Sequence, residues 1–250
     1  GLIGSLLIGL NFAKGLSIGL DIPLIGINHL EGHLVSNFIG NSTLDYPYLC
    51  LLVSGGHTQI ILVEDNAYKI LGETVDDAAG EAFDKGAKIL KLNYPGGPEI
   101  ERLSKNGDTS KYKFTVPVVK KNPYDFSFSG LKTALLYLVR DMSEEDIDMN
   151  IAHIAASYQE VILDTLFHKL TNVINDYHIN NISIVGGVSV NKRFRLKATD
   201  FSNEKNINIF FPDIKYCTDN AAMIAMAGYI KFKNKEYSEL NLTANPRLTF

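Results

Sequence analysis

Two histidines, His29 and His33, stand four residues apart in a segment with helical character. On a helix this spacing places both side chains on one face, as ligands of a single metal ion require. Glu31 lies between them and points elsewhere, so the segment lacks the HExxH order, in which a glutamate beside the first histidine acts as general base. The pair indicates either a metal site or two ordinary surface histidines. A third ligand would come from elsewhere, and the candidates are His57, Asp76, Asp77 and Asp219.

Two glycine-rich turns have the composition of anion-binding loops. Residues 54–57 (SGGH) separate two apolar runs, and backbone N–H groups there could converge on a phosphate or carboxylate. A plain hairpin turn is the alternative. Gly186 and Gly187 follow a buried strand and open a helix, whose N-terminus could accept an anion or face an adenine ring. The GxGxxG spacing of a dinucleotide site is absent, and helix–strand packing is the alternative.

Carboxylates supply a third group of candidates. Asp77, Glu81 and Asp84 share one face of a predicted helix over residues 75–91, which is either a solvated face or a site for ribose hydroxyls or metal-bound water. The Gly96-Gly97 pair in the next loop would let a nucleoside lie against the backbone. Asp219 heads the last predicted helix, as its N-cap or as a metal ligand.

The elements that must position these residues form a mixed α/β pattern, with a hairpin early and strand–helix alternation late. Asn28, Ser129 and either Thr218 or Asp219 are the expected helix caps, and Thr74 is expected to begin the helix 75–91 with Asp77 at its capping-box position. We expect a polar turn at 40–46, a tight loop at 94–98 and an irregular segment at 111–128. The predicted strands are 23–27, 48–53, 58–63, 181–185 and 207–211. The predicted helices are 1–20, 28–39, 75–91, 98–105, 130–141, 144–176, 190–200 and 219–233.

Composition narrows the class of protein. The chain has 250 residues, 46% hydrophobic and 21% charged, which excludes wholesale disorder. A net charge of −4 argues against a stand-alone nucleic-acid binder. Two cysteines exclude a disulfide scaffold and indicate a reducing cytosol. Residues 1–13 are apolar but shorter than a membrane span and follow no basic segment, which favours a buried or interface helix.

Seven segments, in order along nearly the whole chain, resemble one family. They are 28–33 (NHLEGH), 52–58 (LVSGGHT), 72–85 (GETVDDAAGEAFDK), 94–98 (YPGGP), 126–132 (FSFSGLK), 186–191 (GGVSVN) and 217–225 (CTDNAAMIA). The chain resembles the TsaD family, the tRNA threonylcarbamoyladenosine transferases once called O-sialoglycoprotein endopeptidases.

The resemblance implies a fold and a domain organisation. The family has the two-lobed α/β fold of actin-like ATPases, shared with sugar kinases and heat-shock ATPases. Its members begin with a strand-hairpin block carrying a phosphate loop similar to Thr-Ser-Cys-Asp-Asp-Thr, which this sequence lacks. We therefore expect an incomplete first lobe, with 1–27 as its remnant and 228–250 packing back on it, and a metal- and nucleotide-binding lobe over 28–227.

The resemblance also implies an activity and a site. The family transfers threonylcarbamoyl from threonylcarbamoyl-AMP to N6 of adenosine 37 in tRNAs that read codons beginning with A. His29, His33 and Asp219 would hold one divalent metal ion, with iron and zinc as the leading candidates. The nucleotide ligand is threonylcarbamoyl-AMP or ATP. Its acyl-phosphate would lie on Leu52, Val53, Ser54, Gly55 and Gly56, and its ribose and adenine on Asp84, Gly97 and Asn191.

The implied partners are tRNA and subunits of the TsaB and TsaE type, in the cytoplasm and without a membrane. We expect helix 1–20 to be partly exposed. The chain alone is expected to self-associate or to be poorly soluble, and to transfer threonylcarbamoyl slowly or not at all unless the missing first segment is supplied in cis. The alternatives are an impaired remnant or scaffold of the same complex, a metalloprotease, and a small-molecule phosphotransferase. The expected tRNA phosphate contacts are Lys111, Lys113, Lys120, Lys121, Lys132, Lys192, Arg193 and Arg195.

Overall fold

The computed structural model describes residues 2–40, 43–65, 67–116, 119–246 and 248. At its centre lies a five-stranded mixed sheet in the order β3-β2-β1-β4-β5. The strands β1 to β3 pair antiparallel, whereas β4 and β5 continue the sheet in parallel with β1. Their bounds are β1 Tyr48–Val53, β2 Thr58–Glu64, β3 Ala67–Glu73, β4 Asn181–Val185 and β5 Asn208–Phe210.

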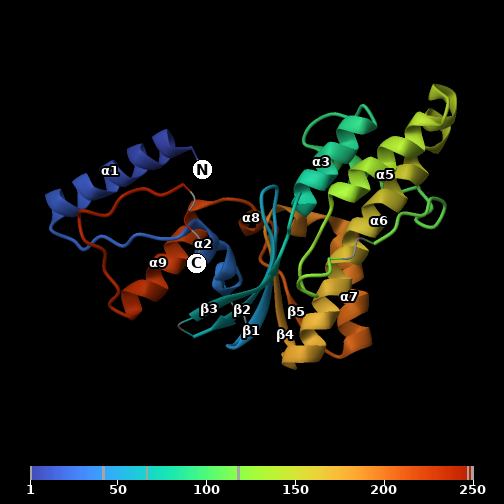
Figure 1. Cartoon of the computed structure of the whole chain (residues 1–250). Helices are drawn as coiled ribbons and strands as arrows, with labels where there is room; N and C mark the ends of the chain where they lie inside the picture. The colour runs from blue at the N-terminus through green and yellow to red at the C-terminus, as the bar shows by residue number, and fades with distance from the viewer. Residues whose placement is uncertain (1, 41–42, 66, 117–118, 247, 249–250) are drawn as a thin grey trace.

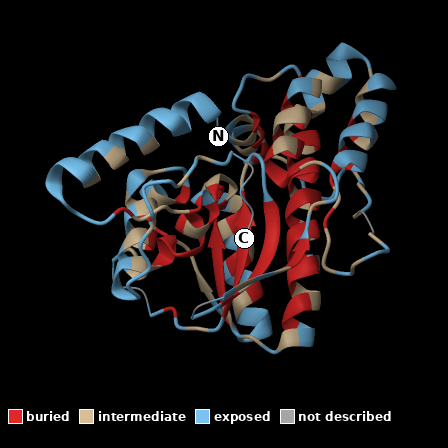
Figure 2. Cartoon of the chain, turned by 60° about the vertical axis from the view of Figure 1, so that its left-hand side comes forward, coloured by how far each residue is buried: buried red, intermediate tan, exposed pale blue. Residues whose placement is uncertain are grey.

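Both faces of the sheet are covered, which explains why β1 reads as an unbroken apolar run. Leu49, Leu51 and Val53 face a large core, while Cys50 and Leu52 face a smaller one on the other side. All six β1 residues are buried (Figure 2). The helices that contribute to the large core are α3 Ala79–Ile89, α4 Gly96–Ser104, α5 Ser129–Arg140, α6 Glu144–Tyr177 and α7 Lys192–Lys205. Those on the other face are α2 His29–Leu34, η1 Ser36–Phe38 and α9 Ala221–Lys233.

Two glycines bring neighbouring segments against the end of β1. A Cβ on Gly80, at the start of α3, would lie 2.6 Å from the Ser54 carbonyl oxygen. Gly186, just after β4, has a φ of +92°, and a Cβ there would lie 2.4 Å from the Val53 carbonyl oxygen. Only glycine allows both close approaches. The β1–β2 turn therefore lies directly against α3 and the segment that leads from β4 to α7.

Helix α1, Ile3–Leu20, has no buried residue and extends away from the sheet (Figure 1). The predicted helix is confirmed over these residues, with Gly1 outside the described chain, and so is its exposure. The expectation that it is buried is wrong in this structure. By length and composition α1 is apolar enough to cross a membrane, the one such helix in the described chain. It is joined to the rest through an extended segment in which Leu24 forms a β-bridge with Ser238.

Most predicted elements are confirmed, with differences where local hydrogen bonds redirect the backbone. The predicted strand 23–27 is reduced to the single bridge at Leu24, and β3 was missed. The predicted helix 28–39 breaks at Val35 and continues as η1. Helix α4 begins at Gly96, inside the expected loop, because Pro98 needs no N–H donor in a first turn. Asn41 and Ser42 of the predicted polar turn lie outside the described residues. A one-turn helix, α8 Ile214–Cys217, was also missed.

Three expected caps are wrong, because nearby groups compete for the same side chains. Thr74 and Asp77 form no capping box on α3, which begins at Ala79: the Thr74 hydroxyl donates to the Asp77 carbonyl, and the Asp77 carboxylate accepts a hydrogen bond from Lys85. Ser129 is the first residue of α5, and its hydroxyl donates to Asp76. Helix α9 is capped by Asn220 in place of Thr218 or Asp219. The expected cap Asn28 is confirmed on α2.

Candidate active site

Helix α2 places two imidazoles side by side. Its first turn is fixed by Asn28, whose Oδ1 accepts a hydrogen bond from the backbone N–H of Leu30 at 2.9 Å. The rings of His29 and His33 follow one helical turn apart, with centroids 5.0 Å from each other. The His33 side chain is 3% exposed and that of His29 is 49% exposed. One histidine of the pair is thus anchored in the core while the other faces the solvent.

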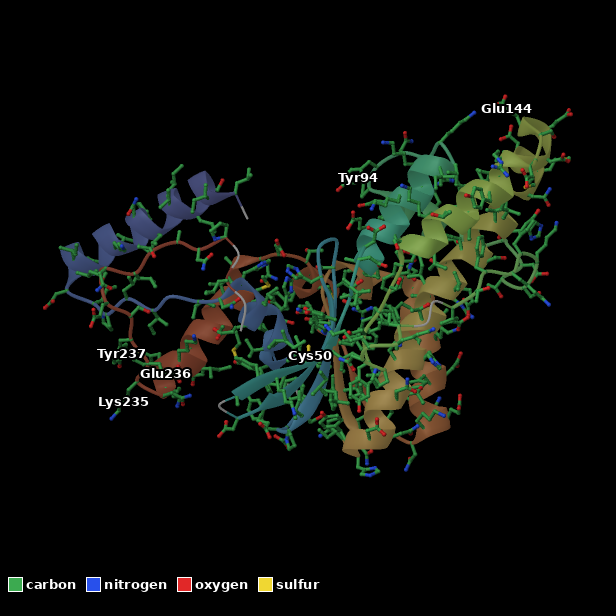
Figure 3. All side chains as sticks on the ribbon, in the orientation of Figure 1. Cys50, Tyr94, Glu144, Lys235, Glu236 and Tyr237 are labelled. Carbon is green, nitrogen blue, oxygen red and sulfur yellow. The ribbon has the colours of Figure 1, made fainter. Side chains whose placement is uncertain are left out.

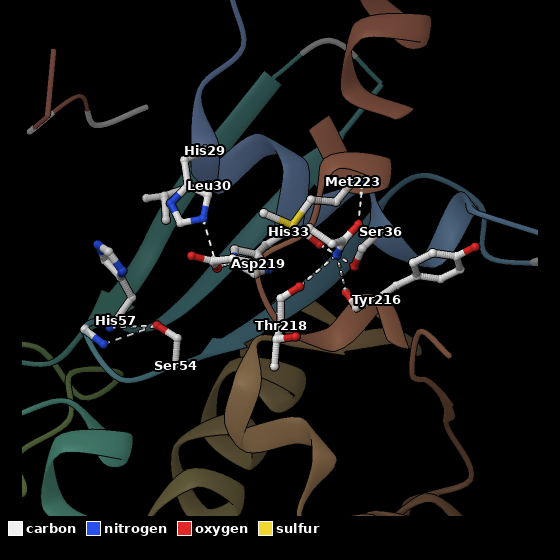
Figure 4. A network of polar contacts seen from close by, with 12 residues as sticks. His29, Leu30, His33, Ser36, Ser54, His57, Tyr216, Thr218, Asp219 and Met223 are labelled. Atoms are coloured by element: carbon white, nitrogen blue, oxygen red, sulfur yellow. Dashed lines mark hydrogen bonds and ion pairs between the residues drawn. The ribbon is translucent and has the colours of Figure 1, made fainter. Parts of the chain in front are cut away.

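Asp219 approaches this pair from the loop before α9. Asn220 caps the helix by accepting a hydrogen bond from the Met223 N–H at 2.9 Å, which leaves the Asp219 carboxylate uncommitted to the helix. Its Oδ1 lies 3.1 Å from Nε2 of His29 and 3.1 Å from Nε2 of His33 (Figure 4). The structure therefore brings together the three residues that the resemblance implied as metal ligands.

The donor geometry fits a divalent metal ion. Two ligand atoms, each about 2.1 Å from one tetrahedral ion, lie about 3.4 Å apart, close to the distances between Asp219 and the two histidines. The three ligand atoms all lie within 4.8 Å of one another. Nδ1 of His33 is buried without a hydrogen-bond partner among the described residues. The mixed nitrogen and carboxylate set suits iron or zinc, and does not distinguish them.

The charges in the trio favour a neutral imidazole and an ionised carboxylate, the states that bind metal. Burial, together with the neighbouring His29, lowers the pKa of His33 below 6.5, although Asp219 opposes this. Partial burial alone would raise the pKa of Asp219, but His29 and His33 outweigh it and hold that pKa below its ordinary value.

The other candidate third ligands do not join this group. Asp76 accepts hydrogen bonds from Ser127, Phe128 and Ser129, and so fixes the start of α5. Asp77 is paired with Lys85 at 2.6 Å. His57 faces the trio from the β1–β2 turn but lies outside the group of three ligand atoms (Figure 4).

The β1–β2 turn is held by its own serine. The Ser54 hydroxyl accepts hydrogen bonds from the N–H groups of Gly56 and His57 at 3.3 and 3.0 Å. The Ser54 carbonyl accepts from the Gly80 N–H at 3.2 Å, which ties the turn to α3. Two N–H groups of the expected anion cradle are therefore already engaged. Leu52 and Val53 are fully buried residues of β1, so neither presents surface to a ligand in this structure.

A cavity of about 260 Å³ lies on the α3 side of this turn. Four of the expected substrate-binding residues line it, from four separate segments: Gly55, Asp84, Gly97 and Asn191. Leu52, Val53, Ser54 and Gly56 do not line it. Gly187, a candidate from the sequence, also lines it, and the residues that sequence reasoning missed are Gly80, Phe83, Tyr94, Pro95, Pro98, Glu101, Val188 and Val190. The signal in the sequence was the place of Tyr94 in the segment 94–98 (YPGGP), and the structure shows its side chain exposed (Figure 3).

Two polar groups shape the cavity. Oδ1 of Asp84 accepts a hydrogen bond from the Gly96 N–H at 2.8 Å and so fixes the loop before α4. Asn191 caps α7 through Oδ1 and donates from Nδ2 to Gln159 at 2.8 Å. Both side chains are thus held in place by the protein before any ligand arrives.

The basic side chains expected to contact tRNA differ in whether they already bind other groups of the chain. Arg193 donates two hydrogen bonds to Glu160, and Arg195 donates to the Ser189 carbonyl while its guanidinium lies over the Phe211 ring. These two arginines are already committed within the chain. Lys111 is bound to Asn150, at the surface.

Comparison with known proteins gives a consistent result. The profile of the TsaD family, described as tRNA N6-adenosine threonylcarbamoyltransferase, matches residues 1–226. A protein of that name from Thermosipho africanus is 50% identical over 249 residues, which cover 99% of this chain and 75% of the relative. Another from Kosmotoga olearia is 50% identical over 250 residues, covering 100% of this chain and 74% of the relative.

Among solved structures, T. kodakarensis HypF is similar with a TM-score of 0.70 and 15% identity, over 90% of this chain and 39% of that one. A full-length HypF, in a phosphate- and nucleotide-bound form, has a TM-score of 0.66 and 12% identity over 87% of this chain and 45% of that one. At this identity the likeness concerns the fold alone.

Proposed function

Since this chain belongs to the TsaD family of tRNA N6-adenosine threonylcarbamoyltransferases, we propose that it transfers threonylcarbamoyl from threonylcarbamoyl-AMP to N6 of adenosine 37 in tRNAs reading codons that begin with A. The observation that carries the proposal is the position of the β1–β2 turn. Gly55 in this turn lines the cavity, while His57, two residues on, faces His29 and Asp219. A donor whose nucleoside fills the cavity would therefore reach the metal ligands with its acyl-phosphate end.

The residues of the cavity bind and orient the donor. The carboxylate of Asp84 accepts hydrogen bonds from ribose hydroxyls, and Gly97 allows the nucleoside to approach the backbone. Asn191, which caps α7, forms part of the cavity wall at the start of that helix. The donor is already activated, since AMP is its leaving group, so correct placement of the amine against the carbamoyl carbon supplies much of the rate. An ion bound by His29, His33 and Asp219 would polarise a phosphate or carbonyl oxygen of the donor.

A metalloprotease is less well supported by the site. Glu31, the only carboxylate between the two histidines, is paired with Lys231 at 2.9 Å, and its side chain is 14% exposed. It is therefore directed away from His29 and His33 and is neutralised by a cation. No general base of the HExxH kind is available from this helix.

We further propose the setting of this activity. The sheet with its flanking helices would be the metal- and nucleotide-binding lobe (28–227) of a two-lobed actin-like fold. Residues 1–27 would pack with 228–250, which is supported by the Leu24–Ser238 bridge and by a hydrogen bond from the Gly26 N–H to the Ser238 hydroxyl. Partner subunits of the TsaB and TsaE type, in the cytoplasm, would cooperate with the chain on tRNA.

The test compares two substrates. The chain is incubated with a divalent metal ion, partner subunits from a bacterial relative and preformed threonylcarbamoyl-AMP, with unmodified tRNA in one arm and a glycoprotein in the other. We expect threonylcarbamoyladenosine in the nucleoside digest and an intact glycoprotein. Cleavage of the glycoprotein without modified nucleoside would favour the protease and contradict the proposal.

A further inference from the structure

His57 holds a fixed place at the junction between the cavity and the metal ligands. Its N–H donates to the Ser54 hydroxyl at 3.0 Å, and its carbonyl accepts from the Ser54 N–H at 2.8 Å. The turn is fixed to α3 through Gly80. The backbone of His57 is therefore rigid, and only its imidazole is free to move at the mouth of the site.

Three imidazoles lie in this region, those of His29, His33 and His57, and that of His57 differs from the other two in its hydrogen bonding. Nε2 of His29 and Nε2 of His33 are both directed at Asp219. The ring of His57 makes no hydrogen bond within the part of the chain that the structure describes, and the residue is exposed. In Figure 4 its ring lies on the same side of the turn as His29 and Asp219. A base that acts on a bound substrate needs such a free nitrogen, within reach of the reacting atoms.

We propose that His57 is the general base of the transfer, an assignment that rests on the proposed function. The lone pair of N6 of adenosine forms a bond to the carbamoyl carbon, the bond from this carbon to the phosphate oxygen breaks, and AMP leaves with that electron pair. The proton lost from N6 moves to an imidazole nitrogen of His57. The proton is released to water after the product leaves, so no further reactant is needed.

The charges around His57 suit this role. Although His57 is exposed by surface area, desolvation by the protein atoms around its ring and the nearby His29 lower its pKa below 6.5, while Asp219 and Glu73 oppose the shift. These groups come from α2, from the loop before α9 and from β3. The ring is thus neutral near pH 7 and has a free lone pair. Glu73 would also stabilise the imidazolium that forms when the proton arrives.

The experiment compares His57→Gln with the unsubstituted chain, under single-turnover conditions with metal ion, partner subunits, preformed donor and tRNA. Glutamine keeps the size and polarity of histidine but does not accept a proton near neutral pH. We expect the transfer rate to fall about 10²- to 10⁴-fold, the usual contribution of general acid–base catalysis. Metal content and affinity for ATP should be unchanged. The matched control is His168→Gln, an exposed histidine on α6 that makes no contact with the site.

The pH profile separates a base from a structural residue. The unsubstituted chain should lose rate as the pH falls through the pKa of His57, and His57→Gln should lack this decline. Imidazole added to His57→Ala should restore part of the rate. A His57→Gln rate equal to that of the unsubstituted chain would overturn the assignment alone, as would a loss of donor or metal binding that accounts for the whole effect. If the unsubstituted chain itself transfers nothing, the proposed function falls and the assignment falls with it.

Discussion

Asp219 Oδ1 lies 3.1 Å from Nε2 of His33, although 186 residues separate them along the chain. The contact exists because Asn220 takes over the capping of α9, and because α2 packs against α9 through the small residue Gly32. A Cβ on Gly32 would lie 3.0 Å from Cδ1 of Ile224 and 3.1 Å from Cγ of Met223, so the two helices pack closely at this glycine and a larger residue would require these side chains to shift. The candidate metal centre thus depends on how α2 and the start of α9 are placed against each other.

The first prediction concerns the metal. His33→Ala should lower the affinity for zinc by more than about 100-fold, since even residues behind the direct ligands contribute about 10- to 100-fold. Metal analysis of the purified proteins and calorimetric titration of the metal-free forms provide the measurement. His168→Ala, which removes an exposed histidine of α6, should bind zinc as the unsubstituted chain does. Equal metal content in His33→Ala and the control would exclude this site.

The second prediction concerns the donor cavity. Asp84→Ala should weaken ATP binding about 10- to 100-fold, because it removes a charged hydrogen-bond acceptor worth about 1.5–3 kcal/mol. Calorimetric titration measures the change. Glu81→Ala is the control, since Glu81 lies on the same helix, pairs with Lys85 and does not line the cavity. Unchanged affinity in Asp84→Ala would remove Asp84 from the binding site.

The third prediction concerns Gly186. Its backbone, with φ at 92° and ψ at 167°, lies in a region that only glycine adopts readily. Gly186→Ala should destabilise the fold by about 1–3 kcal/mol from backbone strain, and the clash with the Val53 carbonyl adds to this. Gly130→Ala in α5 is the control, because a Cβ there meets no atom within 4 Å. Chemical denaturation of both variants gives the comparison, and equal stabilities would contradict the account of this turn.

The fourth prediction concerns Asp76, which accepts hydrogen bonds from two hydroxyls and two N–H groups at the start of α5. Asp76→Ala should lower the free energy of unfolding by about 1–3 kcal/mol. Asp45→Ala, at an exposed position, is the control and should change little.

The contribution of Asp76 should depend on pH. Partial burial alone would raise the pKa of Asp76, but the hydrogen bonds from Ser127, Phe128 and Ser129 outweigh it and hold the pKa below 3.8. Stability from a depressed carboxyl pKa is present above the unfolded value and is lost as the pH falls through the folded one. The difference between Asp76→Ala and the unsubstituted chain should therefore vanish in strong acid. A difference that persists there would show that the carboxylate charge is not the cause.

Much of the fold could be predicted because it follows local patterns. The apolar runs of β1 and β2 and the long periodic helix α6 appear in the sequence with nearly correct bounds. Strand β3 was missed because Lys69 and Glu73 interrupt its apolar character, and pairing with β2 outweighs this. The expected capping box of Thr74 and Asp77 and the expected cap at Ser129 were wrong for a different reason. Asp77 is engaged by Lys85 and Ser129 by Asp76. Capping rules based on spacing consider only the residues at a helix end and so do not take these partners into account.

The candidate site was likewise predictable only where a local pattern marks its residues. Spacing alone indicated His29 and His33, but left four candidates for the third ligand. The choice of Asp219 came from the resemblance to the TsaD family, whose membership is now confirmed, and the geometry agrees with it. Tyr94 and Glu101 were missed, because a residue lines a cavity through tertiary packing that no local pattern records.

The most direct test of the central claim is the transfer of labelled threonine from preformed threonylcarbamoyl-AMP to tRNA, in the presence of metal ion and partner subunits. Incubation is continued long enough for slow product to accumulate. We predict that the label appears in tRNA carrying adenosine at position 37, and that it is absent from tRNA carrying guanosine there and from reactions with the His29→Ala/His33→Ala variant. Equal labelling of the two tRNAs, equal labelling by the variant, or no labelling above a protein-free blank would contradict the account.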